Sequence, residues 1–222
     1  MTWTSFSGIL RTTAIFVVLS SVFLMGCSGN AASPVNKAEF QPLSSDSSSF
    51  YYYVSENRVP LTLSLKWIAV KFASGDPSQQ SAALKGSIAD SLEQAEQFSR
   101  YGVTLLPVKE GITFEALVEG INLLRANTAD FLQVNPVFQA GDTGMIVTDE
   151  FIVTFPPEMS MDEINAVNAS YGVELGDPIL GQENTFVLKA TTATKMDTLS
   201  LANLYQESGV AVYAAPNFVR VK

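Results

Sequence analysis

Few residue types able to do chemistry are present in this sequence. Its 222 residues contain no histidine and a single cysteine, Cys27, alongside 22 acidic and 13 basic residues. Without histidine the chain lacks the usual general base, the Ser-His-Asp triad and the commonest zinc ligand. One cysteine can form neither an intramolecular disulfide nor a thiolate cluster. We therefore expect no catalytic residues, no metal site, no cofactor and no enzymatic activity. A serine or carboxylate hydrolase is the least favoured alternative, because no cluster of such residues is apparent.

The charge of the chain argues against nucleic acid as a partner. The formal net charge is -9 at pH 7, and no run of lysine or arginine interrupts the acidic excess. Affinity for nucleic acid rests mainly on neutralising phosphates with basic side chains. We therefore expect no nucleic-acid binding.

The position of Cys27 suggests a role outside catalysis. Arg11 is the only charge in the first 27 residues, and an apolar run over residues 14–24 follows it. The run is shorter than the roughly 20 residues of a membrane span and is typical of a signal peptide. It ends in Leu24-Met25-Gly26-Cys27, which resembles the lipobox of bacterial lipoproteins. An ordinary signal peptide that happens to contain a cysteine is the alternative.

The lipobox resemblance implies where the chain resides. Residues 1–26 would be a lipoprotein signal peptide, and Cys27 would carry the lipid, such as palmitate, at the new N-terminus. Residues 27–49 are rich in Ser, Ala, Asn and Pro, with few charges. Such a segment cannot bury enough apolar surface to offset its ordering entropy, so we expect a flexible tether. The localisation expected is the bacterial cell envelope, lipid-anchored to a membrane and facing the periplasm or the exterior.

A first folded module is expected over residues 50–140. Leu61, Leu63 and Leu65 alternate with polar residues, which favours a strand. Residues 76–78, Asp-Pro-Ser, offer a helix start, and apolar residues spaced by three and four over 82–100 predict a helix with one buried stripe. The remaining elements expected are a strand over 67–72, a strand over 103–108, a helix over 114–126 and a strand over 130–138.

A second folded module is expected over residues 146–222. Ser160 and Glu163 form a capping box for a helix over 161–169, and Asp197 can cap a helix over 198–208. Strands are expected at 151–155, 173–180, 185–189 and from 210 to the end, with a four-residue loop at 181–184.

The order of elements suggests the fold class. The second module runs β-α-β-β-α-β, which fits a split βαβ, or ferredoxin-like, arrangement. The two modules also share landmarks, including Tyr-Gly-Val at 101–103 and 171–173. We expect an α+β protein with two tandem ferredoxin-like modules, each an antiparallel four-stranded sheet with its helices on one face. An internal duplication and a chance recurrence of short tripeptides both remain open.

The second module, from about Thr148 to Lys222, resembles the propeptide of subtilisin-like serine proteases. The match is to the inhibitor I9 type and especially to the fervidolysin-like N-terminal prodomain. In this family the ending has the pattern V-x-Y-A-x-P-N-Y/F, and Val212 to Phe218 match its last seven positions. The other segments that carry the resemblance are 150–155, 163–168, 171–173 and 184–189.

The resemblance implies a mechanism. In the family, the four-stranded sheet packs on surface helices of the protease, and the C-terminal tail lies in the substrate cleft as an added strand. It would place Phe218, Val219, Arg220, Val221 and Lys222 in that cleft. The alternative is a plain edge strand, with Tyr213 and Phe218 as core residues.

Two exposed acids are further candidates for contacts with a partner. Asp177 precedes Pro178, and Glu183 lies in the expected hairpin loop. Carboxylates are favoured at helix N-termini, so these side chains are expected to cap helices of a partner. Solvated loop charges are the alternative explanation.

Two functions follow from the resemblance. The first is a membrane-anchored protein that binds and inhibits, or assists the folding of, a secreted subtilisin-like serine protease. Because the sequence ends at Lys222 without a catalytic domain, the partner is expected to act in trans. The alternative is a non-inhibitory scaffold or interaction lipoprotein of the cell envelope that keeps the propeptide fold.

Overall fold

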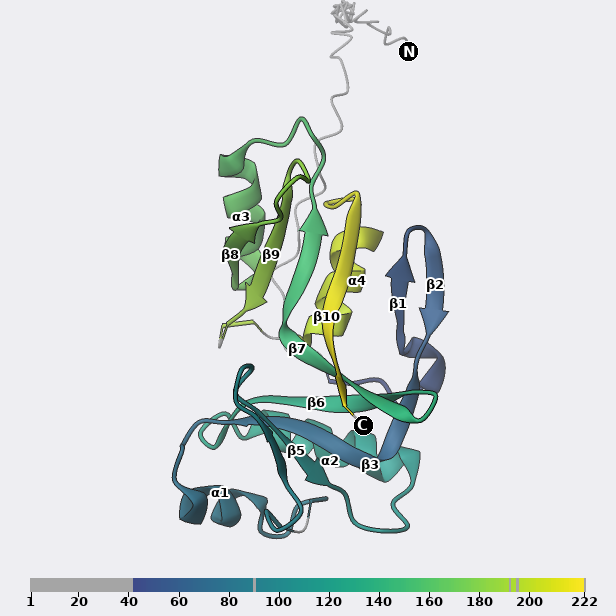
Figure 1. Ribbon diagram of the computed structural model, residues 1–222, viewed down its shortest axis with the longest axis vertical. Helices are drawn as coiled ribbons and strands as arrows, with labels where there is room; N and C mark the ends of the chain where they lie inside the picture. Colours follow the sequence, from purple (N-terminus) through teal and green to yellow (C-terminus); the bar gives the residue numbers. More distant parts are fainter. Residues whose placement is uncertain (1–41, 90, 192, 195, 222) are drawn as a thin grey trace, which may run out of the picture. The chain divides into compact units, whose positions relative to one another are not determined.

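The computed structural model describes residues 42–89, 91–191, 193–194 and 196–221 (Figure 1). These residues belong to one compact unit. Cys27, Lys222, the expected signal peptide and most of the expected tether lie outside the described residues. Among the helices that are described, none combines the length and apolarity needed to cross a membrane.

The first half of the described chain contains a small hairpin, a four-stranded segment and two helices. Its elements are η1 (Ser47–Ser49), β1 (Tyr51–Val54), β2 (Asn57–Pro60), β3 (Thr62–Phe72), α1 (Pro77–Leu84), β4 (Glu96–Phe98), β5 (Val103–Pro107), α2 (Phe114–Ala126) and β6 (Phe131–Ala140). β1 and β2 form a separate two-stranded antiparallel sheet.

The second half follows without a linker after a tight turn. Its elements are β7 (Thr143–Thr154), α3 (Met161–Tyr171), β8 (Val173–Pro178), β9 (Thr185–Ala190), α4 (Thr198–Glu207) and β10 (Tyr213–Val221). The predicted capping box of α3 is confirmed, since the Ser160 and Glu163 side chains each accept a bond from the other's backbone N–H. Asp197 caps α4 through the N–H of Ser200.

The helix start predicted at residues 76–78 is confirmed, but the helix predicted over 82–100 is wrong. α1 starts at Pro77, with Asp76 as its N-cap, and ends at Leu84, while residues 96–98 are strand β4. Gly86 has a φ of +79°, a left-handed conformation that a helix cannot continue through. The apolar residues that suggested a helical stripe still face the core, because Ile88, Leu92 and Ala95 pack against it from turns.

The predicted α+β class with antiparallel strands is confirmed, but the strands form one eight-stranded sheet. Its order is β4-β5-β3-β6-β7-β9-β8, with β10 paired to the other edge of β7. β7 is long enough to serve both halves: residues 143–146 pair with β6, and residues 150–154 pair with β9. β10 follows the opposite edge of β7 through both halves, with a bulge between Pro216 and Phe218.

Three apolar cores stabilise this sheet. One lies between the first-half strands and α2, and includes Leu117, Ile121 and Phe138. A second lies between the second-half strands and α3 and α4, which Figure 1 shows on the same side of those strands. The third lies on the opposite face of the first-half strands, and Val137 and Ile146 are part of it. Because successive strand residues point to opposite faces, β6 supplies Val137 to the third core and Phe138 to the first.

The fold begins before residue 50. Leu43 is buried, and its backbone N–H donates to Asn122 Oδ1 at 2.8 Å, while its carbonyl accepts from Asn122 Nδ2 at 3.2 Å. The burial of Leu43 and its two hydrogen bonds to Asn122 of α2 therefore fix this segment to the fold. The composition of the segment had suggested a flexible tether up to residue 49.

Candidate functional site

The predicted cleft tail lies in the sheet. Phe218, Val219, Arg220 and Val221 form the last residues of β10 and pair in order with Val147, Ile146, Met145 and Gly144 of β7. The backbone of this segment is therefore already engaged along one edge by a neighbouring strand. The fifth predicted residue, Lys222, lies outside the described residues.

The side chains of this tail are also in use. Phe218 packs against the first core and meets the Tyr52 ring at a centroid distance of 5.2 Å. Val219 and Val221 pack into the third core on the opposite face, and Val221 is only 5% exposed. Among the described residues of the tail, only Arg220 is exposed. To enter a protease cleft, the tail would have to leave both β7 and these cores.

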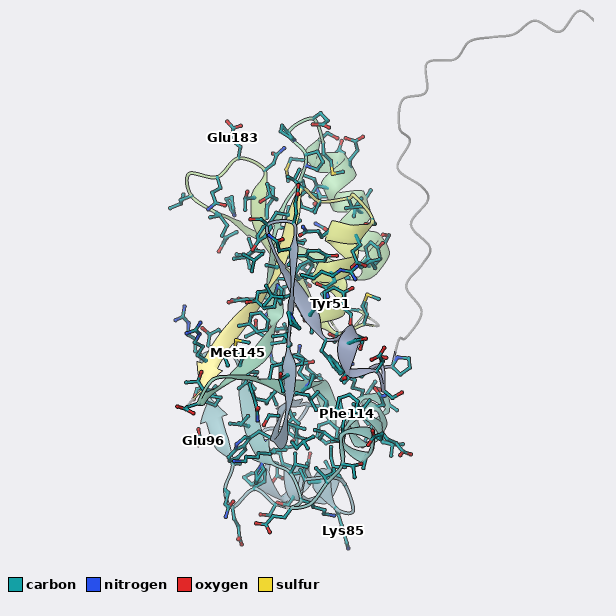
Figure 2. The ribbon with its side chains drawn as sticks, turned by 90° about the vertical axis from the view of Figure 1, so that its right-hand side faces the viewer. Tyr51, Lys85, Glu96, Phe114, Met145 and Glu183 are labelled. Atoms are coloured by element: carbon teal, nitrogen blue, oxygen red, sulfur yellow. The ribbon has the colours of Figure 1, made fainter. Side chains whose placement is uncertain are left out.

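The two predicted acids both face solvent. Asp177 is exposed on the outer strand β8, and Glu183 is exposed in the loop between β8 and β9. Figure 2 shows the Glu183 side chain at the tip of that loop, pointing away from the strands. This placement leaves Glu183 open to a partner and equally suits a solvated loop charge.

The second-half strands have an uncovered face that the sequence reasoning did not locate. α3 and α4 cover the face formed by Phe151, Val153 and Leu188. On the other face, the apolar side chains at the centre belong to none of the three cores. There the half-buried Ile152 lies directly between Ala215 of β10 and Val187 of β9.

Two polar rows border this apolar row, and we call the three rows together the open face. Next to it on one side, Thr154 lies between Tyr213 and Thr185, with the two threonine hydroxyls 3.0 Å apart and Thr185 only 2% exposed. On the other side, Lys189 lies between Glu150 and Glu174. Directly opposed strand residues share a face, so the three rows form one surface. An apolar centre with a polar rim is the usual anatomy of a protein-binding surface.

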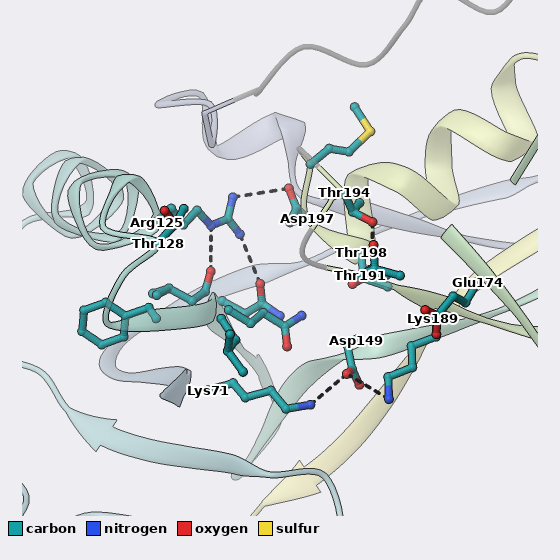
Figure 3. A pocket seen from close by; sticks show the side chains of 17 residues that line it. Lys71, Arg125, Thr128, Asp149, Glu174, Lys189, Thr191, Thr194, Asp197 and Thr198 are labelled. Carbon is teal, nitrogen blue, oxygen red and sulfur yellow. Dashed lines mark hydrogen bonds and ion pairs between the residues drawn. The ribbon is translucent and has the colours of Figure 1, made fainter. Parts of the chain in front are cut away.

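A cleft of about 630 Å³ lies between the two halves of the sheet (Figure 3). It opens where β6 and β9 diverge from the same edge of β7. Its walls come from α2, β6 and the segment that leads into α4, and Lys189 belongs to both the cleft and the open face. The charged side chains that line it are Lys71, Arg125, Asp149, Glu174, Lys189 and Asp197.

One side of the cleft is bridged by a carboxylate between two ammonium groups. Asp149 Oδ2 lies 2.9 Å from Lys71 Nζ of β3 and 3.8 Å from Lys189 Nζ of β9. Since β3 belongs to the first half and β9 to the second, this cluster ties the halves together at the bend of β7.

The other side of the cleft is bridged by a buried ion pair. Arg125 Nη1 lies 3.6 Å from Asp197 Oδ2, and the two side chains are only 8% and 7% exposed. Arg125 also donates through Nε to the Val134 carbonyl at 2.7 Å and through Nη2 to Asn135 Oδ1 at 3.2 Å. Burial lowers the pKa of Arg125, and the charge of Asp197 partly offsets that effect.

The ion pairs across the cleft connect the two halves of the sheet. The three basic and three acidic side chains of the cleft balance in charge. The buried Thr198 hydroxyl has no hydrogen-bond partner among the described residues, but a neutral hydroxyl distinguishes neither anion nor cation. Within the part of the chain that is described, no group of acidic residues could hold a metal ion.

Comparison of the chain with protein-family models, with curated proteins and with solved structures gives no match in any of the three. The functional assignment therefore depends on the residues and the geometry above.

Proposed function

We propose that this chain is a propeptide-like protein that binds a subtilisin-like serine protease through the open face. In this proposal Cys27 carries a lipid, and the folded part is held at a membrane of the bacterial cell envelope. The observation that carries the proposal is the apolar row of Ala215, Ile152 and Val187, whose side chains are half-buried and belong to none of the three apolar cores.

The order of strands supports a propeptide-like fold. In the second half, β7-α3-β8-β9-α4-β10 gives the sheet order β8-β9-β7-β10. In the first half, β3-α1-β4-β5-α2-β6 gives the corresponding order β4-β5-β3-β6. Both orders match the one expected of a split βαβ arrangement. We therefore propose two ferredoxin-like modules whose sheets are joined by the pairing of β6 with β7.

The chemistry of the open face suits packing against helices. Ile152 and Val187 offer branched apolar side chains, and Tyr213 adds an amphipathic ring at the rim. The row of Glu150, Lys189 and Glu174 carries a net negative charge, so a partner with basic groups along that border is favoured.

A direct test measures inhibition of secreted subtilisin-like proteases by the detergent-solubilised chain. We expect a sub-micromolar inhibition constant. Val187→Lys, which places a charge at the centre of the open face, should weaken inhibition at least tenfold, to about ten times that constant. Glu158→Lys is the matched control, because Glu158 is exposed on the turn before α3. Absence of binding by the folded chain to several such proteases would overturn the proposal.

A second candidate function is a non-inhibitory scaffold of the cell envelope. The observation that favours it is the commitment of Phe218 to Val221 to the sheet and to two cores. A scaffold of this kind would bind a protease without blocking peptide hydrolysis, or would leave proteases unbound. Parallel binding and inhibition measurements on the same protease separate the two functions.

A further inference from the structure

The β1–β2 hairpin starts and ends in the first core. Phe50 and Leu61 flank the hairpin, both are buried there, and the Leu61 N–H donates to the Phe50 carbonyl at 2.8 Å. The Phe50 ring also packs against Phe138 and Phe114 at centroid distances of 5.6 and 6.1 Å. The base of the hairpin is therefore fixed to the first half of the chain.

The body of the hairpin lies on α4, in the second half. A single oxygen, Oε1 of Glu207, accepts hydrogen bonds from Tyr51 Oη at 2.7 Å, Tyr53 Oη at 2.8 Å and Arg58 Nη2 at 2.8 Å. The Arg58 guanidinium lies 4.5 Å above the Tyr51 ring centroid. Asn203 adds a bond from its Nδ2 to the Tyr51 carbonyl at 2.8 Å.

The same hairpin contacts β10. Tyr52 packs edge-to-face on Phe218, at the start of the predicted tail. Gln206 connects the two elements, because its Nε2 donates to the Ser55 carbonyl at 2.8 Å and its Oε1 accepts from the Ala214 N–H at 3.0 Å. The hairpin is thus connected to β10 on either side of the bulge. Tyr52 contacts Phe218 directly after the bulge, and Gln206 of α4 links the hairpin to Ala214 before it.

Glu207 stands at an unfavourable position in α4, and its bonds to the hairpin compensate for that position. Glu207 is the last residue of α4, where a carboxylate opposes the helix dipole, and the last turn contains no basic residue. The helix alone would therefore be more stable without this charge. Burial would raise the pKa of Glu207, yet the Tyr51 and Tyr53 hydroxyls and the Arg58 charge outweigh it and lower that pKa.

We infer that the β1–β2 hairpin is a strap that keeps β10 in the sheet, with Glu207 as its fastening point. Residues 218–221 then leave β7 more readily once the hairpin has detached from α4. One consequence rests on the proposed function: detachment of the strap would free residues 218–221 to enter the substrate cleft of a protease bound at the open face, and so would strengthen inhibition.

Amide hydrogen exchange of the full chain tests the strap without any protease. In Glu207→Ala we expect the amides of residues 51–59 and 218–221 to exchange about 5- to 20-fold faster, while those of α3 are unchanged. Glu158→Ala is the matched control and should alter neither segment. If residues 218–221 keep their wild-type protection in Glu207→Ala, the strap is excluded, whether or not the hairpin amides change.

A milder variant covers the case in which Glu207→Ala unfolds the chain. Tyr51→Phe removes one donor to Glu207 and leaves every charge in place. It should raise exchange of residues 218–221 by about 2- to 5-fold, again without change in α3. Unchanged protection of residues 218–221 in this variant would exclude the strap.

The protease measurement separates the strap from the proposed function. If strap and function both hold, Glu207→Ala inhibits a subtilisin-like protease more strongly than the wild-type chain does. Faster exchange of residues 218–221 without any protease binding would support the strap and contradict the proposed function.

Discussion

The buried ion pair of Arg125 and Asp197 predicts that removing the charge of Asp197 lowers the free energy of unfolding. Asp197 caps α4 by accepting from the Ser200 N–H, and it also compensates the charge of Arg125 across the cleft. Asp197→Ser keeps a good N-cap residue, and it removes the charge together with the oxygen that accepts from the Ser200 hydroxyl. Arg125 would then retain two hydrogen bonds, to Val134 and Asn135, but no counter-charge. Stranding a buried charge in this way should lower the free energy of unfolding by about 3 kcal/mol.

The second half of this prediction is a rescue. Adding Arg125→Met to Asp197→Ser removes the stranded charge and keeps much of the side-chain volume. The double variant should regain at least about 1 kcal/mol over Asp197→Ser, although the Val134 carbonyl loses its partner.

Urea unfolding followed by circular dichroism measures these differences, provided that the transition is two-state. The matched control is Asp162→Ser, which removes an exposed acid from the first turn of α3. An Asp197→Ser variant as stable as the wild-type chain, or a double variant less stable than Asp197→Ser, would refute the role given to this pair.

Three further predictions concern the tail, the strap and a turn. Ending the chain at Asn217 removes the buried Val221 and the half-buried Phe218 and Val219. The free energy of unfolding measured in urea should therefore fall by about 3 kcal/mol or more. A truncated chain as stable as the wild-type chain would contradict this packing. Because the folded pKa of Glu207 is lowered, its contribution is complete above the unfolded pKa of about 4.3 and is lost as the pH falls through the folded pKa. Near-ultraviolet circular dichroism of the hairpin tyrosines should therefore change below about pH 4 in the wild-type chain and not in Glu207→Gln, and the same change in both would exclude Glu207 as its origin. Gly172→Ala should lower the free energy of unfolding by about 1 to 3 kcal/mol, because Gly172 has a φ of +69° and a Cβ there would lie 2.8 Å from the Ala193 carbonyl carbon. Thermal unfolding measures this change, and an unchanged melting temperature would contradict it.

Local signals in the sequence predicted much of the second half. Ser160 with Glu163 and Asp197 with the apolar run after it mark helix starts that depend only on neighbouring residues. The helix over 82–100 failed because a period of three to four in apolar residues does not reveal that Gly86 breaks the chain into turns.

The candidate site could be predicted only in part, because its contacts join residues far apart in the chain. The tail was identified as a strand, but the sequence does not show that Val221 pairs with Gly144. The open face depends on which strands become neighbours of β7. Tyr51 and Glu207 are separated by 156 positions, and neither residue alone signals the other.

The central claim, that a subtilisin-like protease binds the open face, is tested most directly by hydroxyl-radical footprinting. The chain is compared alone and with a protease whose active site is covalently blocked, so that only contacts outside the substrate cleft are reported. We predict reduced oxidation of Ile152, Val187 and Tyr213, and unchanged oxidation of Met161, which is exposed at the start of α3. Binding that leaves Ile152, Val187 and Tyr213 as reactive as in the free chain would contradict the claim.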